Sequence, residues 1–232
     1  MMQTPILAPS RAYALWASTY PARAHNPVML AEERAMLALM PGNLDGITVL
    51  DAGCGSGRYM LHACDRGAFR VIGVDLSPEM LERASEELST YRNNTDIELM
   101  QGCLTDLPVP DAWADLTISG LAVGHVENLA LALAEISRVT RPGGIVLCSD
   151  VHPIGHALGW LRDFKHGGER YAVRHTQHLY SRWHTACASV GLAIEQVLEP
   201  MLNPADIPPD AHFDRVAMEV PVALVFQLRR TP

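Results

Sequence analysis

The sequence predicts an α/β protein built on a doubly wound, mostly parallel β-sheet. Short β-rich runs alternate along the chain with helical stretches, which is the pattern of a parallel sheet covered by helices. The segment Gly53-Cys-Gly-Ser-Gly57 follows the first of these runs and opens a helix, and Asp75 ends the second run. We therefore expect a ligand at the carboxyl ends of the strands, where sheets of this kind bind their ligands.

Two helices precede the first strand. We expect the first over residues 9–18 and the second over residues 27–40. In the second, apolar residues recur at near-helical spacing until Pro41-Gly42 ends the pattern. These helices make up an N-terminal lid, residues 1–45, in front of a sheet core.

The core extends over residues 46–151 and contains five strands. Ser77 suits the N-cap of the helix that follows the second strand, and Pro78 suits its first helical position. The segment Arg141-Pro-Gly-Gly144 is expected to end the third core helix. The strands are predicted at 47–50, 70–74, 97–100, 114–119 and 145–149, and the helices at 57–67, 77–88 and 127–139.

The alternation changes after residue 152. Residues 160–174 are expected to form a β-hairpin around Gly167-Gly168, inserted between strand five and the last helix. Such an insertion, residues 152–180, either roofs a pocket or only extends the packing, and the sequence leaves both readings open. In the C-terminal part, 181–232, we expect Ser181 to cap a helix ending near Gly191, strands at 192–198 and 216–228, and a proline-rich loop at 203–214.

Composition excludes several classes of protein. The formal net charge is −8 and the basic residues cluster only at Arg229-Arg230, which disfavours a nucleic-acid partner. The five cysteines form no Cys-x-x-Cys pair, so we expect free thiols and no structural zinc site. No apolar run is long enough for a membrane span, and Met1 to Ser10 lacks a signal-peptide pattern. We expect a single cytoplasmic domain, monomeric or homodimeric.

The glycine-rich turn differs from the dinucleotide-binding fingerprint. That fingerprint needs a third glycine where this chain has Arg58 or Met60, so the close approach of a pyrophosphate is lost. Asp51, just before the turn, can instead meet a cationic ammonium group. Asp75 can accept hydrogen bonds from both hydroxyls of a ribose. The expected ligand is a nucleoside that carries an amino acid and no phosphate.

Four segments in order resemble the class I S-adenosylmethionine-dependent methyltransferases. They are Asp51-Ala-Gly-Cys-Gly-Ser-Gly57, Asp75-Leu-Ser-Pro-Glu-Met80-Leu, Gln101-Gly-Cys103-Leu-Thr-Asp-Leu-Pro108 and Arg141-Pro-Gly-Gly144. The resemblance covers roughly residues 10–150 and is closest to the branch of the ubiquinone/menaquinone-biosynthesis methyltransferases. It implies a Rossmann-like fold with a seven-stranded sheet, and S-adenosylmethionine as the cofactor.

The resemblance also implies which residues hold the cofactor. Cys103 stands where the family often has an acidic residue for the adenine amino group, and a thiol is a poor hydrogen-bond partner. Tyr20 either lies over the methionine moiety or packs its helix, and Met80 either stacks on the adenine or belongs to the core. The full expected set is Tyr20, Asp51, Gly53, Cys54, Gly55, Gly57, Asp75, Leu76, Met80, Cys103, Leu104 and Ser119.

Methyl transfer is an in-line displacement in which the protein aligns the reactants and excludes water. After strand four, Ser119-Gly-Leu-Ala-Val-Gly-His125 lacks the [Asn/Asp]-Pro-Pro-aromatic signature of many amino-group methyltransferases. That favours a hydroxyl, carbon or alkylamine of an apolar or aromatic metabolite as the acceptor. His125 and His152 are the candidate bases.

The sequence leaves other readings open. A metal held by Asp150, His152 and His156 is conceivable, but Pro153 interrupts the helical spacing, so we expect none. The glycines and carboxylates predict binding and not turnover, so a non-catalytic S-adenosylmethionine-binding module is one alternative. A nucleic-acid or protein methyltransferase is another, and it would need a basic groove or an added domain that the sequence does not show.

Overall fold

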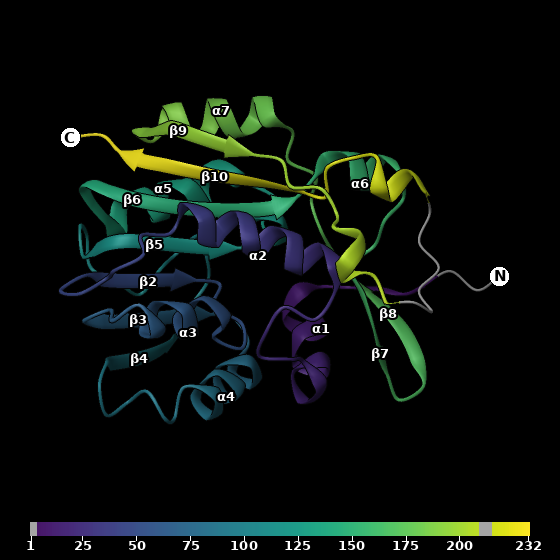
Figure 1. Ribbon diagram of the computed structural model, residues 1–232, viewed down its shortest axis with the longest axis horizontal. Coiled ribbons are helices and arrows are strands. Elements are labelled where there is room, and N and C mark those ends of the chain that lie inside the picture. The colour runs from purple at the N-terminus through teal and green to yellow at the C-terminus, as the bar shows by residue number, and fades with distance from the viewer. Residues whose placement is uncertain (1–3, 209–214) are drawn as a thin grey trace.

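The computed structural model describes residues 4–208 and 215–232 of the chain. Its main sheet has seven strands in the order β4-β3-β2-β5-β6-β10-β9. Neighbouring strands pair in parallel except β10, which runs antiparallel to both β6 and β9. The prediction of a seven-stranded, mostly parallel sheet is confirmed (Figure 1).

The elements of the core lie close to their expected positions. Before them come β1 (Ile6–Leu7), α1 (Pro9–Trp16), a 3₁₀ helix (Ala17–Thr19) and α2 (Pro27–Leu39). The core itself consists of β2 (Thr48–Ala52), α3 (Arg58–Asp65), β3 (Arg70–Asp75), α4 (Pro78–Glu87), β4 (Asp96–Gln101), β5 (Ala114–Gly120), a 3₁₀ helix (Val123–His125), α5 (Leu129–Val139) and β6 (Thr140–Val151).

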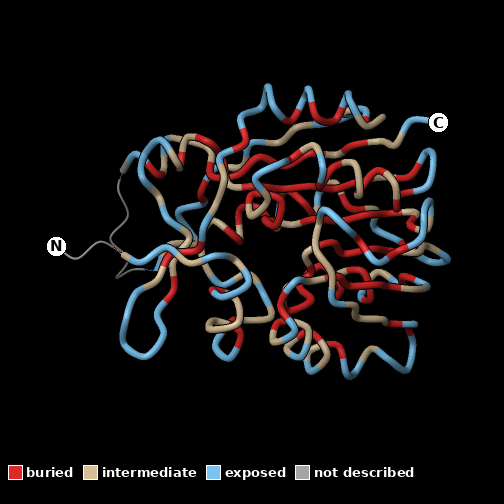
Figure 2. The backbone as a smooth tube through the Cα atoms, turned by 180° about the vertical axis from the view of Figure 1, so that it is seen from behind, coloured by how far each residue is buried: buried red, intermediate tan, exposed pale blue. Residues whose placement is uncertain are grey.

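Helices cover both faces of the sheet, because neighbouring residues of each strand point to opposite sides. Val49 of β2 belongs to one buried cluster, with Met36 of α2 and Met60 of α3 among its members. Its neighbour Leu50 belongs to a second buried cluster, on the other face, that includes Ile136 of α5. The buried backbone of the central strands forms the middle layer in Figure 2, with exposed segments around its periphery.

The inserted hairpin is present and joins the N-terminal segment. It consists of β7 (Asp163–His166) and β8 (Glu169–Val173), and β1 pairs in parallel with β8 to give a second, three-stranded sheet. The Trp16 ring of α1 stacks on Phe164 of β7 with 4.8 Å between centroids. We call β1, α1, β7 and β8 the cap; it lies beside one end of the main sheet (Figure 1).

Local capping explains where several helices start. Ser77 caps α4 as expected, because its Oγ accepts a hydrogen bond from the Met80 amide. Asn128 caps α5 in the same way. The Ser181 prediction is wrong: the N-cap of α7 (Tyr180–Ser189) is Leu179, two residues earlier, with no side-chain bond there, and Ser181 lies inside the helix. The segment Arg141-Pro-Gly-Gly144 follows α5 but lies within the irregular start of β6.

The C-terminal part differs from the expectation in its second strand. Strand β9 (Leu192–Leu198) is as predicted, whereas β10 (Ala223–Arg230) starts later than residue 216, since Arg215–Met218 form a 3₁₀ helix. A short helix, α6 (Pro153–Ala157), and a 3₁₀ turn, Pro204–Asp206, were not expected. Of the proline-rich loop, residues 209–214 lie outside the described residues.

Two further features bear on the class of protein. Within the described ranges, no helix has the length and apolar character needed to cross a bilayer. All five cysteines are free, and four of them are buried. Burial raises the pKa of the Cys54 and Cys148 thiols, so both are held in the protonated form.

Candidate functional site

A cavity of about 240 Å³ opens at the carboxyl ends of β2, β3 and β5. It is bounded by the glycine-rich turn, the end of β3, the segment after β4, the segment after β5 and parts of the cap. Many of the expected cofactor residues line it: Tyr20, Asp51, Gly53, Cys54, Gly55, Asp75, Leu76, Met80, Cys103 and Leu104. Segments more than eighty residues apart in the chain thus meet at one place.

Two expected residues lie outside this cavity. Gly57 adopts φ +86° at the N-cap of α3, and a Cβ there would press on Ala84 of α4 and on Leu88, the C-cap of that helix, so the glycine lets the two helices approach. Ser119 is fully buried in β5 and its hydroxyl donates to the Ala52 carbonyl across 2.8 Å. Both residues support the strands and turn that form the cavity.

The glycine-rich turn and the end of β3 are joined by hydrogen bonds to Asp75. One carboxylate oxygen accepts from the Gly55 amide at 2.8 Å and the other accepts from the Ser77 amide at 2.9 Å. Burial raises the pKa of Asp75, and these amide donors oppose that rise. Each carboxylate oxygen keeps a second lone pair that can accept from a ligand hydroxyl.

Asp51 is the second carboxyl of the cavity, and one of its oxygens is left without a partner. The residue is 1% exposed, and its Oδ2 makes no hydrogen bond within the described chain. Burial raises its pKa to about 7, with the nearby Arg58 guanidinium opposing the rise. A buried carboxylate oxygen without a donor is unfavourable by itself. A cationic donor such as an ammonium group would satisfy it.

The first turn of α3 is held by a buried ion pair. Glu32 on α2 is fully buried and accepts from the Arg58 Nη1 at 2.9 Å and from the Tyr59 hydroxyl at 2.7 Å. The Ser149 hydroxyl donates to the same carboxylate. Arg58 and Tyr59 line the cavity, so this network fixes one wall. This network was not predicted from the sequence, although a glutamate inside the apolar pattern of residues 27–40 was a signal for it.

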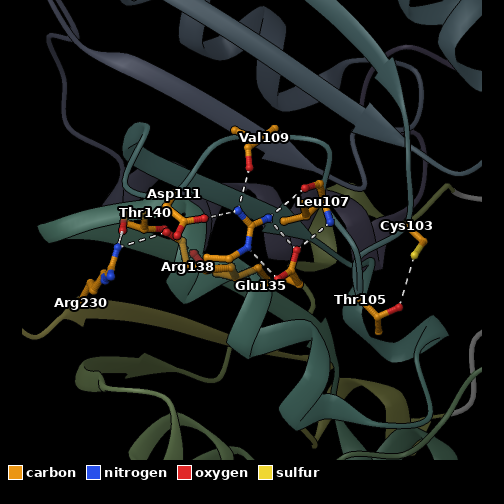
Figure 3. Close-up of polar contacts among 10 residues, drawn as sticks. Cys103, Thr105, Leu107, Val109, Asp111, Glu135, Arg138, Thr140 and Arg230 are labelled. Carbon is orange, nitrogen blue, oxygen red and sulfur yellow. Dashed lines mark hydrogen bonds and ion pairs between the residues drawn. The ribbon is translucent and has the colours of Figure 1, made fainter.

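Arg138 of α5 anchors the loop that carries Cys103 and Leu104. It donates to the carbonyls of Leu107 and Val109 at 2.9 Å each, and it pairs with Glu135 and Asp111. Figure 3 shows these contacts gathered on the one guanidinium, with the Cys103 thiol directed to the Thr105 hydroxyl at 3.3 Å. The loop after β4 is therefore held firmly although it is not part of a strand or helix.

His125 lines the cavity, but its ring nitrogens are both occupied. Its Nδ1 lies 3.0 Å from the Arg174 carbonyl, which can only accept, so Nδ1 carries the proton. Its Nε2 then accepts from the Tyr13 hydroxyl at 2.9 Å. Burial lowers the pKa of His125 to about 3, and the charge of Arg162 adds to the effect. The imidazole is neutral at pH 7 and faces the cavity through Tyr13.

His152, the other candidate base, lies away from the cavity. It is the N-cap of α6, where its Nδ1 accepts from the Ile154 amide, and its Nε2 is 3.2 Å from Glu199. Nearby, His175 bridges Asp150 at 2.9 Å and His156 at 2.7 Å. In the described parts of the chain, no cluster of three or more His, Cys, Asp or Glu side chains could hold a metal ion.

Comparison with known proteins agrees with this geometry. Residues 50–148 match the family described as "Methyltransferase domain". A solved S-adenosylmethionine-dependent methyltransferase from Mesorhizobium loti is 28% identical and superposes with a TM-score of 0.69, over 86% of this chain and 98% of that one. An uncharacterized protein of Haemophilus influenzae is 31% identical over 208 residues, 76% of this chain and 80% of that protein.

Curated enzymes are similar over shorter stretches. A malonyl-[acyl-carrier protein] O-methyltransferase of Pectobacterium atrosepticum is 40% identical over 111 residues, 48% of this chain and 41% of that enzyme. A demethylmenaquinone methyltransferase of Bacillus licheniformis is 33% identical over 105 residues, 44% of each chain. The chain spans about half the length of the malonyl-[acyl-carrier protein] O-methyltransferases that it matches.

Proposed function

Because the chain belongs to the class I S-adenosylmethionine-dependent methyltransferases, we propose that it transfers a methyl group from S-adenosylmethionine to a small-molecule acceptor. The resemblance seen in the four sequence motifs, to a branch that includes quinone-biosynthesis enzymes, is confirmed by the family match and by the demethylmenaquinone methyltransferases among the relatives. The acceptor and the roles of individual residues are our proposal.

The observation that carries the proposal is the unpartnered oxygen of Asp51. A buried carboxyl with no donor suits a ligand that brings a positive charge, and the amino-acid end of S-adenosylmethionine has an ammonium group. Asp75 would accept from the ribose hydroxyls with the lone pairs left free by Gly55 and Ser77. Leu76, Cys103 and Leu104 would flank the adenine.

The cofactor supplies an activated methyl group on a sulfonium, so the protein has mainly to orient the two reactants and exclude water. The left-handed turn at Gly53 and Gly55 brings bare backbone to the cavity wall. Tyr13, Tyr20 and Arg162 close the cavity from the cap side. This supports a lid role for the cap, composed of parts of the N-terminal segment and of the 152–180 insertion.

The acceptor would enter between the cap and the segment after β5. The sequence favours a hydroxyl, carbon or alkylamine of an apolar or aromatic metabolite, and Leu121, Ala122 and Val126 offer an apolar wall for it. His125 would reach a hydroxyl acceptor only through the Tyr13 hydroxyl, and burial lowers its pKa to about 3, so it would be a weak base and the proposal rests on alignment of the reactants. We do not assign a catalytic role to His152, because it lies outside the cavity.

Calorimetric titration with S-adenosylhomocysteine tests the cofactor, and transfer of a labelled methyl group to a panel of small acceptors tests the activity. We expect micromolar binding, as for a site with several charged hydrogen bonds. Absence of binding at millimolar ligand would contradict the proposal. Tight binding with no transfer to any acceptor would favour the non-catalytic alternative.

A cytoplasmic location, a monomeric or homodimeric state and the absence of a nucleic-acid partner belong to the same proposal. The five free cysteines suit a reducing compartment, and the net charge of −8 disfavours binding to phosphate backbones. Light scattering coupled to size-exclusion chromatography measures the oligomeric state directly. A gel-retardation assay with duplex DNA and tRNA at low salt tests the absence of a nucleic-acid partner. A stable complex with either nucleic acid would overturn it.

A further inference from the structure

Arg162 precedes β7 and stands between two cavities. It lines the cavity assigned above to the cofactor, and it also lines a second cavity of about 600 Å³. Much of the wall of the second cavity is apolar, with Trp16, Met29 and Trp160 among its side chains. A ligand group that binds to this guanidinium could therefore belong to a molecule in either cavity.

The guanidinium is bordered by aromatic side chains. Its Nη2 donates to the Tyr20 hydroxyl at 2.8 Å, and the ring centroids of Tyr13 and Trp16 lie 5.8 and 5.7 Å from its central carbon. Its Nε is buried and makes no hydrogen bond. Among residues 4–208 and 215–232, no carboxylate forms an ion pair with Arg162.

This distinguishes Arg162 from Arg58, which lines the same cavity. Arg58 is paired with Glu32 at 2.9 Å and lies near Glu33. The titratable groups beside Arg162 do not neutralise it: burial raises the pKa of the Tyr13 hydroxyl, which stays protonated and uncharged, and a histidine such as His125 carries either no charge or a positive one. The charge on Arg162 is thus uncompensated within the described chain.

An uncompensated buried cation is costly unless a partner arrives with the ligand. The planar guanidinium matches a carboxylate through two parallel N–H donors, and Nε is one of the donors available here. We propose that Arg162 binds a carboxylate at the junction of the two cavities. The inference rests on the proposed function, because it concerns a ligand of the same site.

Two carboxylates could be the group that Arg162 binds. One belongs to the amino-acid end of the cofactor, and the other would belong to the acceptor, with its apolar body in the second cavity. In the second case a carboxylate oxygen attacks the methyl carbon and the carbon–sulfur bond breaks with its electron pair on sulfur. A methyl ester and S-adenosylhomocysteine form, and no proton moves. Such a reaction needs no base, in keeping with the engaged nitrogens of His125.

The test compares Arg162→Gln with wild type using two pairs of probes. S-adenosylhomocysteine and 5′-methylthioadenosine share the nucleoside and thioether, and only the first has a carboxylate. Decanoate and decanol, added to protein saturated with S-adenosylhomocysteine, form the second pair, in which only decanoate has a carboxylate. Arg170→Gln, on the exposed side of β8, is the matched control because it removes an arginine that is already paired with Asp163.

If Arg162 binds the cofactor carboxylate, Arg162→Gln should lower the affinity for S-adenosylhomocysteine about tenfold or more and leave the affinity for 5′-methylthioadenosine unchanged. For the acceptor carboxylate, the variant should keep its affinity for S-adenosylhomocysteine and lose about tenfold or more for decanoate but not for decanol. Arg162→Lys should retain part of either effect. Equal affinities of Arg162→Gln and wild type for all four probes would overturn the inference.

The failure of the proposed function would look different. In that case wild-type protein would bind neither S-adenosylhomocysteine nor 5′-methylthioadenosine, whatever stands at position 162. Circular dichroism and the melting temperature of each variant show whether it is folded before its affinities are compared.

Discussion

The Gly55 amide donates a hydrogen bond to the Asp75 carboxylate across 2.8 Å, and this contact joins two strands through their carboxyl ends. In the sequence, the glycine-rich turn and the acidic end of the next strand are two separate signals. In the structure, the carboxylate orders the turn before any ligand arrives. Preorganisation of this kind lowers the cost of ordering a loop on binding.

Asp75→Ala should lower the affinity for S-adenosylhomocysteine by about 10- to 100-fold, since hydrogen bonds to a charged group contribute about 1.5–3 kcal/mol. Asp75→Asn is the matched control, because an amide oxygen can still accept from the Gly55 amide but lacks the charge. We expect it to lie between alanine and wild type in calorimetry. Unchanged affinity of the alanine variant would show that the ribose lies elsewhere.

The turn itself can be tested at Gly55, which adopts φ +54° and lines the cavity. Gly55→Val should abolish measurable binding of S-adenosylhomocysteine, because a side chain there would meet Met80 and share the cavity. Gly46→Val is the control for strain alone: φ is +73° and nothing lies within 4 Å of a Cβ. Both should lose about 1–2 kcal/mol of stability.

Calorimetry and thermal unfolding measured on both glycine variants separate the two effects. The control should bind S-adenosylhomocysteine like wild type, despite its lower melting temperature. If Gly46→Val lost binding as well, strain rather than the filled cavity would be the cause.

The raised pKa of Asp51 predicts that cofactor binding depends on pH. Its pKa of about 7 in the folded chain exceeds the unfolded value of about 3.9, so the free protein loses stability from this group as pH rises between those values. A cationic ligand group prefers the ionised carboxylate. Affinity for S-adenosylhomocysteine should therefore rise roughly tenfold from pH 6 to pH 8, with release of a proton.

Calorimetry in buffers of different ionisation enthalpy measures that proton. Asp51→Asn should bind more weakly at pH 8 and show no such release. Proton uptake, or the same pH dependence in the asparagine variant, would assign the effect to another group.

The sequence predicts the parts of the site that depend on local chemistry. Asp51, Gly53 and Asp75 follow from a strand, a turn and a strand end within 25 residues, and Ser77 caps its helix through a bond to Met80, three residues on. Local spacing does not say which way a residue faces, however. Ser119 follows a pattern that suits the site, yet its hydroxyl bonds to the neighbouring strand.

The residues that the sequence misses are those brought together from distant segments. Tyr13 meets His125 across 112 positions, and Arg162 meets Tyr20 across 142. Neither pairing has a local pattern that would reveal it. The two-residue strand β1 is another case, because Ile6–Leu7 exists as a strand only through pairing with β8.

The Glu32–Arg58 pair predicts a large effect on stability. Glu32→Gln should cost about 3–5 kcal/mol, because it leaves the Arg58 guanidinium in a buried site with a weaker partner. That loss should lower the melting temperature by roughly 2–4 °C per kcal/mol in a domain of this size. Glu33→Gln, on the partly exposed neighbour, should cost less than about 1 kcal/mol.

Thermal and urea unfolding of the two glutamine variants test this ordering. The same side chains hold the first turn of α3, so Glu32→Gln should also weaken S-adenosylhomocysteine. Equal stabilities for the two variants would mean that Glu32 is not the partner that compensates Arg58.

His125 should stay neutral across the physiological range. Burial lowers its pKa to about 3, whereas an unfolded histidine titrates near 6.5. Unfolding then takes up a proton below about pH 6.5, so this residue's contribution is complete above that pH and is lost as pH falls toward 3. In NMR spectra its ring signals should not titrate between pH 5 and 8, and the nitrogen shifts should show a proton on Nδ1 and none on Nε2.

The signals can be assigned with His125→Gln, and the causes can be separated with two further variants. Arg162→Gln should raise the pKa, since a nearby positive charge is removed, while the proton stays on Nδ1. Tyr13→Phe should keep that tautomer too, because the Arg174 carbonyl holds it, but should shift the Nε2 signal. A wild-type His125 that titrates near pH 6.5 would place the ring in water and free it to act as a base without Tyr13.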